Sequence, residues 1–285
     1  MFDFFFDTAD IFYIRDLWKK LDSIIDPTHI RGVTTNPNAF NKIDMNSIGE
    51  WRVQLHKLCE VISEIRGDDK GVVYVQAPNS EMSPVDVLRW AQFICPVTDG
   101  STSIGIKIPP FYPILEIVDE LNSFTEVNVT GVSDCSTALS CFTYDVRYVS
   151  LIPGRMEERG INSIEHLGFA QRRKNSSAEI ISGSMRTIEG LESVCDVGTV
   201  PTIGSRVWDE ILQKGPELLL KFSEKPFIHK KFSPLIGADN IQLSVDFFEQ
   251  MDECGNSVYN ESASKYCTTS VSKIHPSVKT EGKNV

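Results

Sequence analysis

The sequence predicts an α/β protein built as a (β/α)8 barrel, and three observations support this. Strand-like and helix-like segments alternate eight times along the chain. The 285 residues, 41% of them hydrophobic and 24% charged, are enough for one barrel of this kind. The main alternative is a doubly wound open sheet, which usually carries a glycine fingerprint. No G-x-G-x-x-G or G-x-x-x-x-G-K motif occurs here.

The eight predicted strands are short apolar runs bounded by polar or turn-forming residues. In chain order they are Asp3–Asp7, Gly32–Asn36, Val72–Gln76, Ser103–Ile108, Glu126–Val132, Tyr148–Ile152, Glu179–Gly183 and Thr199–Ile203. A predicted helix follows each strand. These helices are Ala9–Lys20, Ile48–Ile65, Pro84–Phe93, Tyr112–Ser123, Ser136–Phe142, Ser163–Arg172, Ile188–Val194 and Ser205–Gln213.

A further helix is predicted after the eighth unit, over Asp239–Met251. Its apolar residues are Ile241, Leu243, Val245, Phe247 and Phe248. We therefore predict a catalytic barrel domain over residues 1–252 that includes this C-terminal helix. Residues 253–285 are rich in Ser, Thr, Asn and Lys, and we expect them to form a flexible polar tail.

The charge and cysteine content narrow the choice of partners and compartment. The formal net charge of −11 argues against nucleic acid or an anionic membrane as the main partner. A small anion held by one or two arginines remains compatible with it. The seven cysteines are scattered without a C-x-x-C pair, so we expect no disulfide framework, no zinc site and a cytoplasmic protein. No apolar run approaches the roughly 18 residues of a membrane span.

Lys107 is the most informative residue of the chain. On a strand, alternation places Ile104, Ile106 and Ile108 on one face and Gly105 and Lys107 on the other. A lysine on the inner face of a buried strand lowers its pKa, and a neutral amine can attack a carbonyl to form a Schiff base. The alternative interpretation is a lysine on an exposed face or edge.

Polar residues gather where the predicted strands end, which is where barrel enzymes carry out their chemistry. Alternation is expected to point each of them inward, although each could also be a structural polar group with satisfied hydrogen bonds. They are Asp7, Thr34, Thr35, Asn36, Gln76, Lys107, Asn128, Thr130, Ser150 and Ser182. Together they place a carboxylate, amides, an amine and hydroxyls around one opening.

Two arginines follow the sixth and seventh predicted strands. Arg155 and Arg186 would suit a phosphate, because a guanidinium presents a planar fork of donors. Loops after the late strands of a barrel often bind phosphate. The alternative is that either arginine is a surface ion-pair partner.

The order of these motifs resembles the transaldolase family, in its short branch that also contains fructose-6-phosphate aldolase. The resemblance covers roughly residues 2 to 251. The matching pieces are Phe6-Asp7-Thr8-Ala9-Asp10, Gly32-Val33-Thr34-Thr35-Asn36-Pro37, Ile106-Lys107-Ile108-Pro109, Asn128-Val129-Thr130, Gly154-Arg155 and Ser184-Met185-Arg186-Thr187.

The resemblance implies a reaction without metal or other cofactor. Lys107 would form a Schiff base with the C2 carbonyl of a ketose phosphate, and Asp7 would act as acid and base on the C4 hydroxyl. Thr130 and Gln76 would position the catalytic water. The family transfers a dihydroxyacetone unit from sedoheptulose 7-phosphate or fructose 6-phosphate to an aldose phosphate, in the pentose phosphate pathway.

The resemblance also implies substrate-binding residues and an assembly. Asn36 would bind the dihydroxyacetone part, and Arg155, Ser184 and Arg186 the phosphate. The further candidates for substrate binding are Thr35, Asn128 and Ser150. Short transaldolases form pentamers or decamers, which implies a homo-oligomer. The predicted C-terminal helix could reach a neighbouring subunit or pack on its own barrel.

Two positions depart from the family's pattern. Transaldolases usually have a glutamate where this chain has Gln76, which can orient water but cannot take its proton. The aldolases have a tyrosine where this chain has Ile152. Because Ser150 and Arg186 are the forms typical of transaldolases, transaldolase activity is the preferred hypothesis. The alternatives are a fructose-6-phosphate aldolase and a weakly active sugar-phosphate binding protein.

Overall fold

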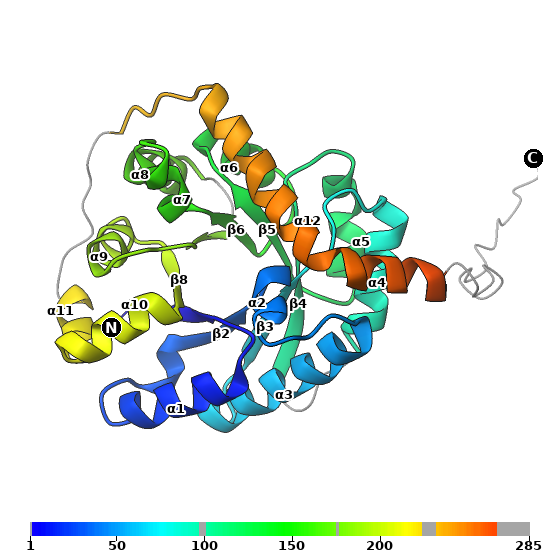
Figure 1. The fold of residues 1–285 in the computed structure, drawn as a ribbon. Coiled ribbons are helices and arrows are strands. Elements are labelled where there is room, and N and C mark those ends of the chain that lie inside the picture. Colours follow the sequence, from blue (N-terminus) through cyan, green and yellow to red (C-terminus); the bar gives the residue numbers. More distant parts are fainter. Residues whose placement is uncertain (1, 97–100, 175–176, 224–231, 267–285) are drawn as a thin grey trace, which may run out of the picture.

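The computed structural model describes residues 2–96, 101–174, 177–223 and 232–266, and within these ranges eight parallel strands close into a barrel (Figure 1). The strands pair in chain order from the first to the eighth, and the eighth pairs with the first. They are β1 Phe4–Asp7, β2 Ile30–Thr34, β3 Gly71–Gln76, β4 Thr102–Ile108, β5 Val127–Val132, β6 Tyr148–Leu151, β7 Glu179–Ser182 and β8 Val200–Gly204. The predicted (β/α)8 barrel is confirmed.

A helix follows every strand and packs outside the barrel, as predicted. The helices near the predicted ranges are α1 Ile11–Leu21, α3 Ile48–Arg66, α4 Pro84–Ile94, η2 Ile114–Ile117 with α5 Val118–Asn122, α6 Cys135–Cys141, α8 Ser163–Arg173, α9 Ile188–Asp196 and α10 Ser205–Lys214. Four short helices were not predicted: η1 Pro27–His29, α2 Pro37–Asn41, α7 Pro153–Glu158 and α11 Leu218–Ser223. Two of these, α2 and α7, directly follow the strand ends that carry polar residues.

Side-chain caps fix where several helices begin. The Asp10 carboxylate accepts the backbone N–H groups of Phe12 and Tyr13, which starts α1 at Ile11, four residues after Asp7. Ser47 and Glu50 form a capping box at the start of α3. The first of these caps turns the chain away from the barrel directly after β1.

The inside of the barrel is filled by an apolar layer. It consists of Phe5, Val72, Tyr74, Tyr148, Ile181 and Val200. The rings of Phe5, Tyr74 and Tyr148 meet edge to face, with centroids 5.6–5.9 Å apart. This layer excludes water from the middle of the barrel and leaves the polar residues of the strand ends above it.

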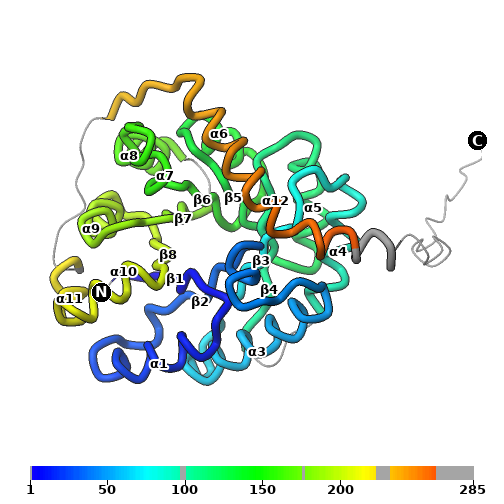
Figure 2. Tube along the Cα trace, viewed as in Figure 1, coloured from blue at the N-terminus to red at the C-terminus, as the bar shows by residue number. Residues whose placement is uncertain are grey.

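The C-terminal helix α12, Ala238–Tyr266, crosses the end of the barrel where the strands finish (Figure 1). Figure 2 shows it beside α2, which lies some 200 residues earlier in the chain. The helix packs on its own barrel. It continues past residue 252, where the predicted barrel domain ends. Val258, which lies beyond that residue, is fully buried. The rest of the predicted tail, residues 267–285, lies outside the described residues.

None of the helices in the described ranges is long and apolar enough to span a membrane.

Candidate active site

Lys107 lies on the inner face of β4, between two polar neighbours. In the strand register it faces Gln76 of β3 on one side and Asn128 of β5 on the other. Its side chain is buried, and Nζ donates a hydrogen bond to the backbone oxygen of Thr35 at 3.0 Å. The inward orientation predicted from strand alternation is therefore correct, and the alternative of an exposed lysine is wrong.

The apolar layer accounts for the electrostatics of Lys107. Gly105 precedes it on the same face and lies against the ring of Tyr74, where an added Cβ would come within 2.3 Å of a ring carbon. The lysine therefore stands directly above aromatic side chains. Burial lowers the pKa of Lys107 to about 8, and the Asp7 carboxylate opposes part of this shift. A useful fraction of neutral amine is present near neutral pH.

Asp7 ends β1 and interacts electrostatically with Lys107. Burial raises the pKa of the Asp7 carboxyl group, and the positive charges of Lys107 and Lys42 act against that rise. Thr34 is hydrogen-bonded to Asp7 Oδ1 at 3.5 Å and to the Thr202 hydroxyl at 2.7 Å. A carboxylate with a raised pKa is a stronger base than an ordinary aspartate, which suits proton transfer near pH 7.

Both strand neighbours of Lys107 carry polar atoms without hydrogen-bond partners in the described part of the chain. Gln76 Oε1 and Asn128 Nδ2 are buried and have no hydrogen-bond partner among the described residues. The other end of the Asn128 amide accepts a hydrogen bond from Ser150 Oγ at 2.8 Å, and Thr130 lies buried farther along β5. Because a buried unpaired polar group is costly, an acceptor and a donor beside Lys107 indicate a place for the oxygen atoms of a ligand or a water.

A cavity of about 730 Å³ opens at this end of the barrel. Five of the predicted site residues line it, namely Asp7, Asn36, Arg155, Ser184 and Arg186. The others are buried and do not line it; they are Thr35, Gln76, Lys107, Asn128, Thr130 and Ser150. Asp7 connects the two sets, because it lines the cavity and its charge acts on Lys107.

The two predicted phosphate ligands come together at one wall of the cavity. Arg155 lies on α7, where burial and the neighbouring Arg186 lower the pKa of its guanidinium. Its Nε is buried without an acceptor among the described residues, while Arg186 Nε donates to Glu158 Oε1 at 2.6 Å. Ser184 adopts φ +57, and its carbonyl oxygen packs so closely on Gly154 that a Cβ there would lie 1.7 Å from it. Two adjacent guanidinium groups are chemically suited to an anion, and Arg186 also forms an ion pair with Glu158.

Three predictions about individual strand-end residues need detail or correction. The Thr35 hydroxyl donates to the backbone oxygen of Tyr74. Thr35 contacts Lys107 through its own backbone oxygen, which accepts the hydrogen bond from Nζ. Asn36 Oδ1 caps α2 by accepting the Ala39 N–H at 2.9 Å. The inward orientation predicted for Ser182 is wrong: Ile181 is the β7 residue inside the barrel, and the Ser182 hydroxyl is hydrogen-bonded to Thr199.

Sequence reasoning missed several residues that line the cavity. Lys42 directly follows α2, Glu158 ends α7, and Phe247, Gln250 and Met251 come from α12. Nothing local in the sequence marks Phe247 or Gln250, because their role depends on α12 crossing the barrel. Glu158 lies three residues after Arg155, and it could have been found if α7 had been predicted.

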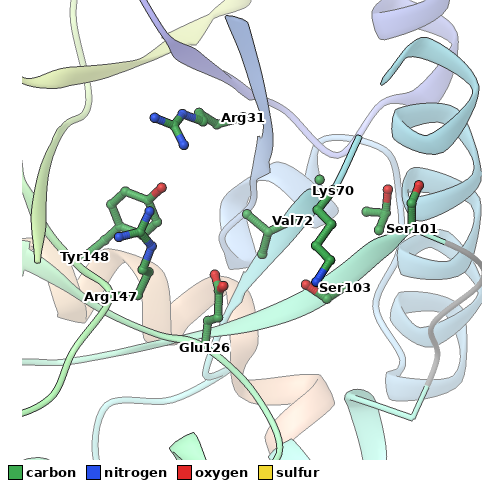
Figure 3. A pocket seen from close by; sticks show the side chains of 10 residues that line it. Arg31, Lys70, Val72, Ser101, Ser103, Glu126, Arg147 and Tyr148 are labelled. Carbon is green, nitrogen blue, oxygen red and sulfur yellow. The ribbon is translucent and has the colours of Figure 1, made fainter. Parts of the chain in front are cut away.

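A second cavity, of about 450 Å³, lies at the opposite end of the barrel (Figure 3). Charged residues line it, and several of them have partners outside the lining. Arg147 forms an ion pair with Glu179 at 2.8 Å, and Glu126 accepts the Tyr74 hydroxyl at 2.8 Å. Catalysis in this fold takes place at the other end of the strands, so we place the candidate active site there.

The buried amine predicts an unusual dependence of stability on pH. The pKa of Lys107 is about 8 in the folded protein and about 10.4 in an unfolded chain. Below pH 8 both states are protonated, and the folded state bears the cost of a buried ammonium, about 3 kcal/mol by linkage. Between pH 8 and about 10.4 the unfolded chain binds more protons at Lys107 than the folded protein does, so the free energy of unfolding rises with pH.

Lys107→Met is therefore expected to be more stable than the parent protein at pH 7, by about 1–3 kcal/mol. The difference should shrink toward zero as the pH approaches about 10.5. Urea unfolding of the variant and the parent protein at pH 7 and at pH 10 measures the stability difference at pH 7 and its decrease at high pH. The exposed Lys57 serves as the control, since Lys57→Met should change stability by no more than about 0.5 kcal/mol. A Lys107→Met protein that is less stable than the parent at pH 7 contradicts the prediction.

Comparison with known proteins agrees with the motifs. No family model matches the chain. A probable transaldolase from Brucella anthropi is 28% identical over 227 residues, covering 76% of this chain and 94% of that protein. A probable transaldolase from a Chelativorans species is 27% identical over 230 residues, with the same coverage. The resemblance to the transaldolase family is thus confirmed.

Among solved structures, the thiamine phosphate pyrophosphorylase from Pyrococcus furiosus has a TM-score of 0.50 at 13% identity. The match covers 78% of this chain and 95% of that protein. It supports the barrel fold alone.

Proposed function

We propose that this protein is a transaldolase that moves a dihydroxyacetone unit from a ketose phosphate to an aldose phosphate through a Schiff base on Lys107. The observation that carries the proposal is the buried Lys107 amine, with its lowered pKa, acting together with Asp7 at the carboxyl ends of the strands. Relatives described as probable transaldolases over most of the chain give it further support.

The residues account for each step of this reaction. Lys107 Nζ attacks the C2 carbonyl, and loss of water gives a protonated imine. Asp7 takes the proton of the C4 hydroxyl, the C3–C4 bond breaks, and its electron pair moves into the imine to give an enamine. The aldose phosphate leaves, and the enamine attacks the aldehyde carbon of the acceptor while Asp7 returns the proton. Water then adds to the imine and releases the new ketose phosphate.

Two polar side chains on the strands beside Lys107 could orient the water that hydrolyses the imine. Gln76 Oε1 is free to accept a hydrogen bond, and the Thr130 hydroxyl lies farther along the neighbouring strand β5. Neither side chain is a base, so both would orient water without taking its proton. Asp7 is then the proton acceptor of the site.

The choice between transfer and simple cleavage depends on water reaching the intermediate. Ile152 is buried against Met156 and the α12 residues Phe247 and Phe248, so an apolar surface lies where the aldolases have a tyrosine. This favours transfer over release of free dihydroxyacetone. Gln76 favours the second candidate, a fructose-6-phosphate aldolase, because that branch also has glutamine there.

An acceptor-dependence assay tests the proposal. Fructose 6-phosphate is supplied with and without an aldose phosphate acceptor, and both transferred product and free dihydroxyacetone are measured. The transferase predicts fast turnover only with the acceptor. Equal release of dihydroxyacetone without it indicates the aldolase, and no turnover in either assay indicates a sugar-phosphate binding protein.

Arg155→Ala is expected to lower kcat/KM for fructose 6-phosphate by about 10- to 100-fold, because it removes charge-assisted hydrogen bonds to phosphate. Borohydride trapping of unphosphorylated dihydroxyacetone should change by less than about threefold. Arg15→Ala, which breaks an exposed ion pair with Glu64, is the control and should leave both values unchanged. Equal losses with both compounds would remove the phosphate role of Arg155.

A further inference from the structure

The C-terminal helix contributes side chains to the anion site. Gln250 and Phe247, both on α12, line the cavity beside Arg155. Arg155 Nη2 donates a hydrogen bond to Gln250 Oε1 at 2.7 Å, and the guanidinium carbon lies 4.9 Å from the centroid of the Phe247 ring. The guanidinium is thus held at one edge by an amide and on one face by an aromatic ring.

We propose that Gln250 is a positioning residue that sets the preference of this site for phosphorylated sugars. By accepting the hydrogen bond from Nη2 of Arg155, it holds the guanidinium in one orientation at the cavity wall, where the phosphate would bind. Arg155 lines the cavity, and its Nε is buried without an acceptor among the described residues, so the guanidinium retains hydrogen-bonding capacity beyond its contact with Gln250. The inference rests on the proposed function, since it assigns the phosphate of that substrate to Arg155.

Fixed contacts on both sides of Gln250 hold α12 in place. Toward the start of the helix, Asn240 Nδ2 donates to the Ser133 backbone oxygen at 2.8 Å, and Ser244 Oγ donates to that of Gly131 at 2.9 Å. After Gln250, Asp252 accepts both the N–H and the hydroxyl of Ser80, at 2.8 and 2.6 Å. These contacts fix the position of residue 250 relative to the barrel.

Close packing between these two anchors also requires a glycine at the end of β5. Gly131 has φ +75, and an added Cβ would come within 2.5 Å of the Phe248 ring. The helix therefore lies directly on the strand end, and Gln250 reaches Arg155 from a rigid support.

The neutral amide matters as much as the geometry. Arg186 already has a carboxylate partner, Glu158, whereas the acceptor for Arg155 carries no charge. The hydrogen-bond partner of Arg155 therefore does not offset the positive charge of the guanidinium. A carboxylate at position 250 would make the same hydrogen bond but would neutralise the guanidinium and repel phosphate.

Two substitutions separate these effects. Gln250→Ala removes the contact to Nη2 and is expected to raise KM for fructose 6-phosphate about tenfold while kcat changes less than twofold. Gln250→Glu keeps an acceptor but adds the competing charge, and it should raise KM about 30-fold or more. The dissociation constant of inorganic phosphate, measured by calorimetry, should rise by similar factors in both variants.

The control is Asn260→Asp, the same change from amide to carboxylate on an exposed residue of α12. It should leave both constants unchanged, and borohydride trapping of dihydroxyacetone should stay within twofold in all three variants. Unchanged phosphate binding in the Gln250 variants, or equal losses with dihydroxyacetone, would overturn the inference. Failure of the parent protein to trap dihydroxyacetone would instead overturn the proposed function, while phosphate binding would still test Gln250.

Discussion

Lys107→Met is expected to lower kcat/KM for dihydroxyacetone transfer by about 10³-fold or more, because it removes the amine that forms the covalent intermediate. Methionine fits a buried apolar position, and the substitution removes a buried charge, so the fold should remain intact. Transfer is followed with fructose 6-phosphate and an aldose phosphate acceptor, and the fold is checked by circular dichroism.

The comparison with Lys57→Met separates loss of chemistry from loss of structure. Lys57 is exposed on α3, and its replacement should leave transfer unchanged. Lys42 is the other lysine whose charge acts on Asp7, so it is the amine that could take over the reaction. Transfer within tenfold of the parent rate in Lys107→Met would contradict the assignment of the nucleophile.

Asp7→Asn is expected to lower the rate of C3–C4 cleavage by about 10²- to 10⁴-fold, the usual contribution of a general base. The amide cannot accept the proton of the C4 hydroxyl. Schiff-base formation should survive, because the Asp7 charge raises the pKa of Lys107 and its removal leaves more neutral amine. The variant should therefore accumulate a six-carbon adduct with fructose 6-phosphate.

Borohydride reduction followed by mass spectrometry distinguishes this adduct from the three-carbon adduct that the parent protein accumulates after cleavage. Asp16→Asn, at an exposed position of α1, should behave like the parent protein. A three-carbon adduct formed at the parent rate in Asp7→Asn would show that another group takes the C4 proton.

The sequence was sufficient for the barrel and for the inward direction of Lys107, because both depend on local patterns. Alternation along β4 separates Ile104, Ile106 and Ile108 from Gly105 and Lys107, and a buried strand has to follow that pattern. Strand order then follows from the chain order of parallel β/α units. Arg155 and Arg186 lie close together because they follow β6 and β7, which are neighbouring strands.

The features that the sequence predicted wrongly or not at all depend on packing between segments far apart in the chain. Ser182 was expected to point inward, but the register of β7 places Ile181 in the apolar layer instead. The path of α12 across the barrel is fixed by contacts of Ser80 and Ser133 with residues more than 100 positions later in the chain. The apolar pattern of this helix fits several partners, so neither its path nor the role of Gln250 could be read from it.

The most direct test of the covalent mechanism is peptide mass spectrometry of the parent protein after borohydride reduction in the presence of fructose 6-phosphate. We predict a three-carbon adduct on the peptide that contains Lys107, absent when borohydride or the sugar is omitted. An adduct on Lys42 or another lysine, or none at all, would contradict the account of the site.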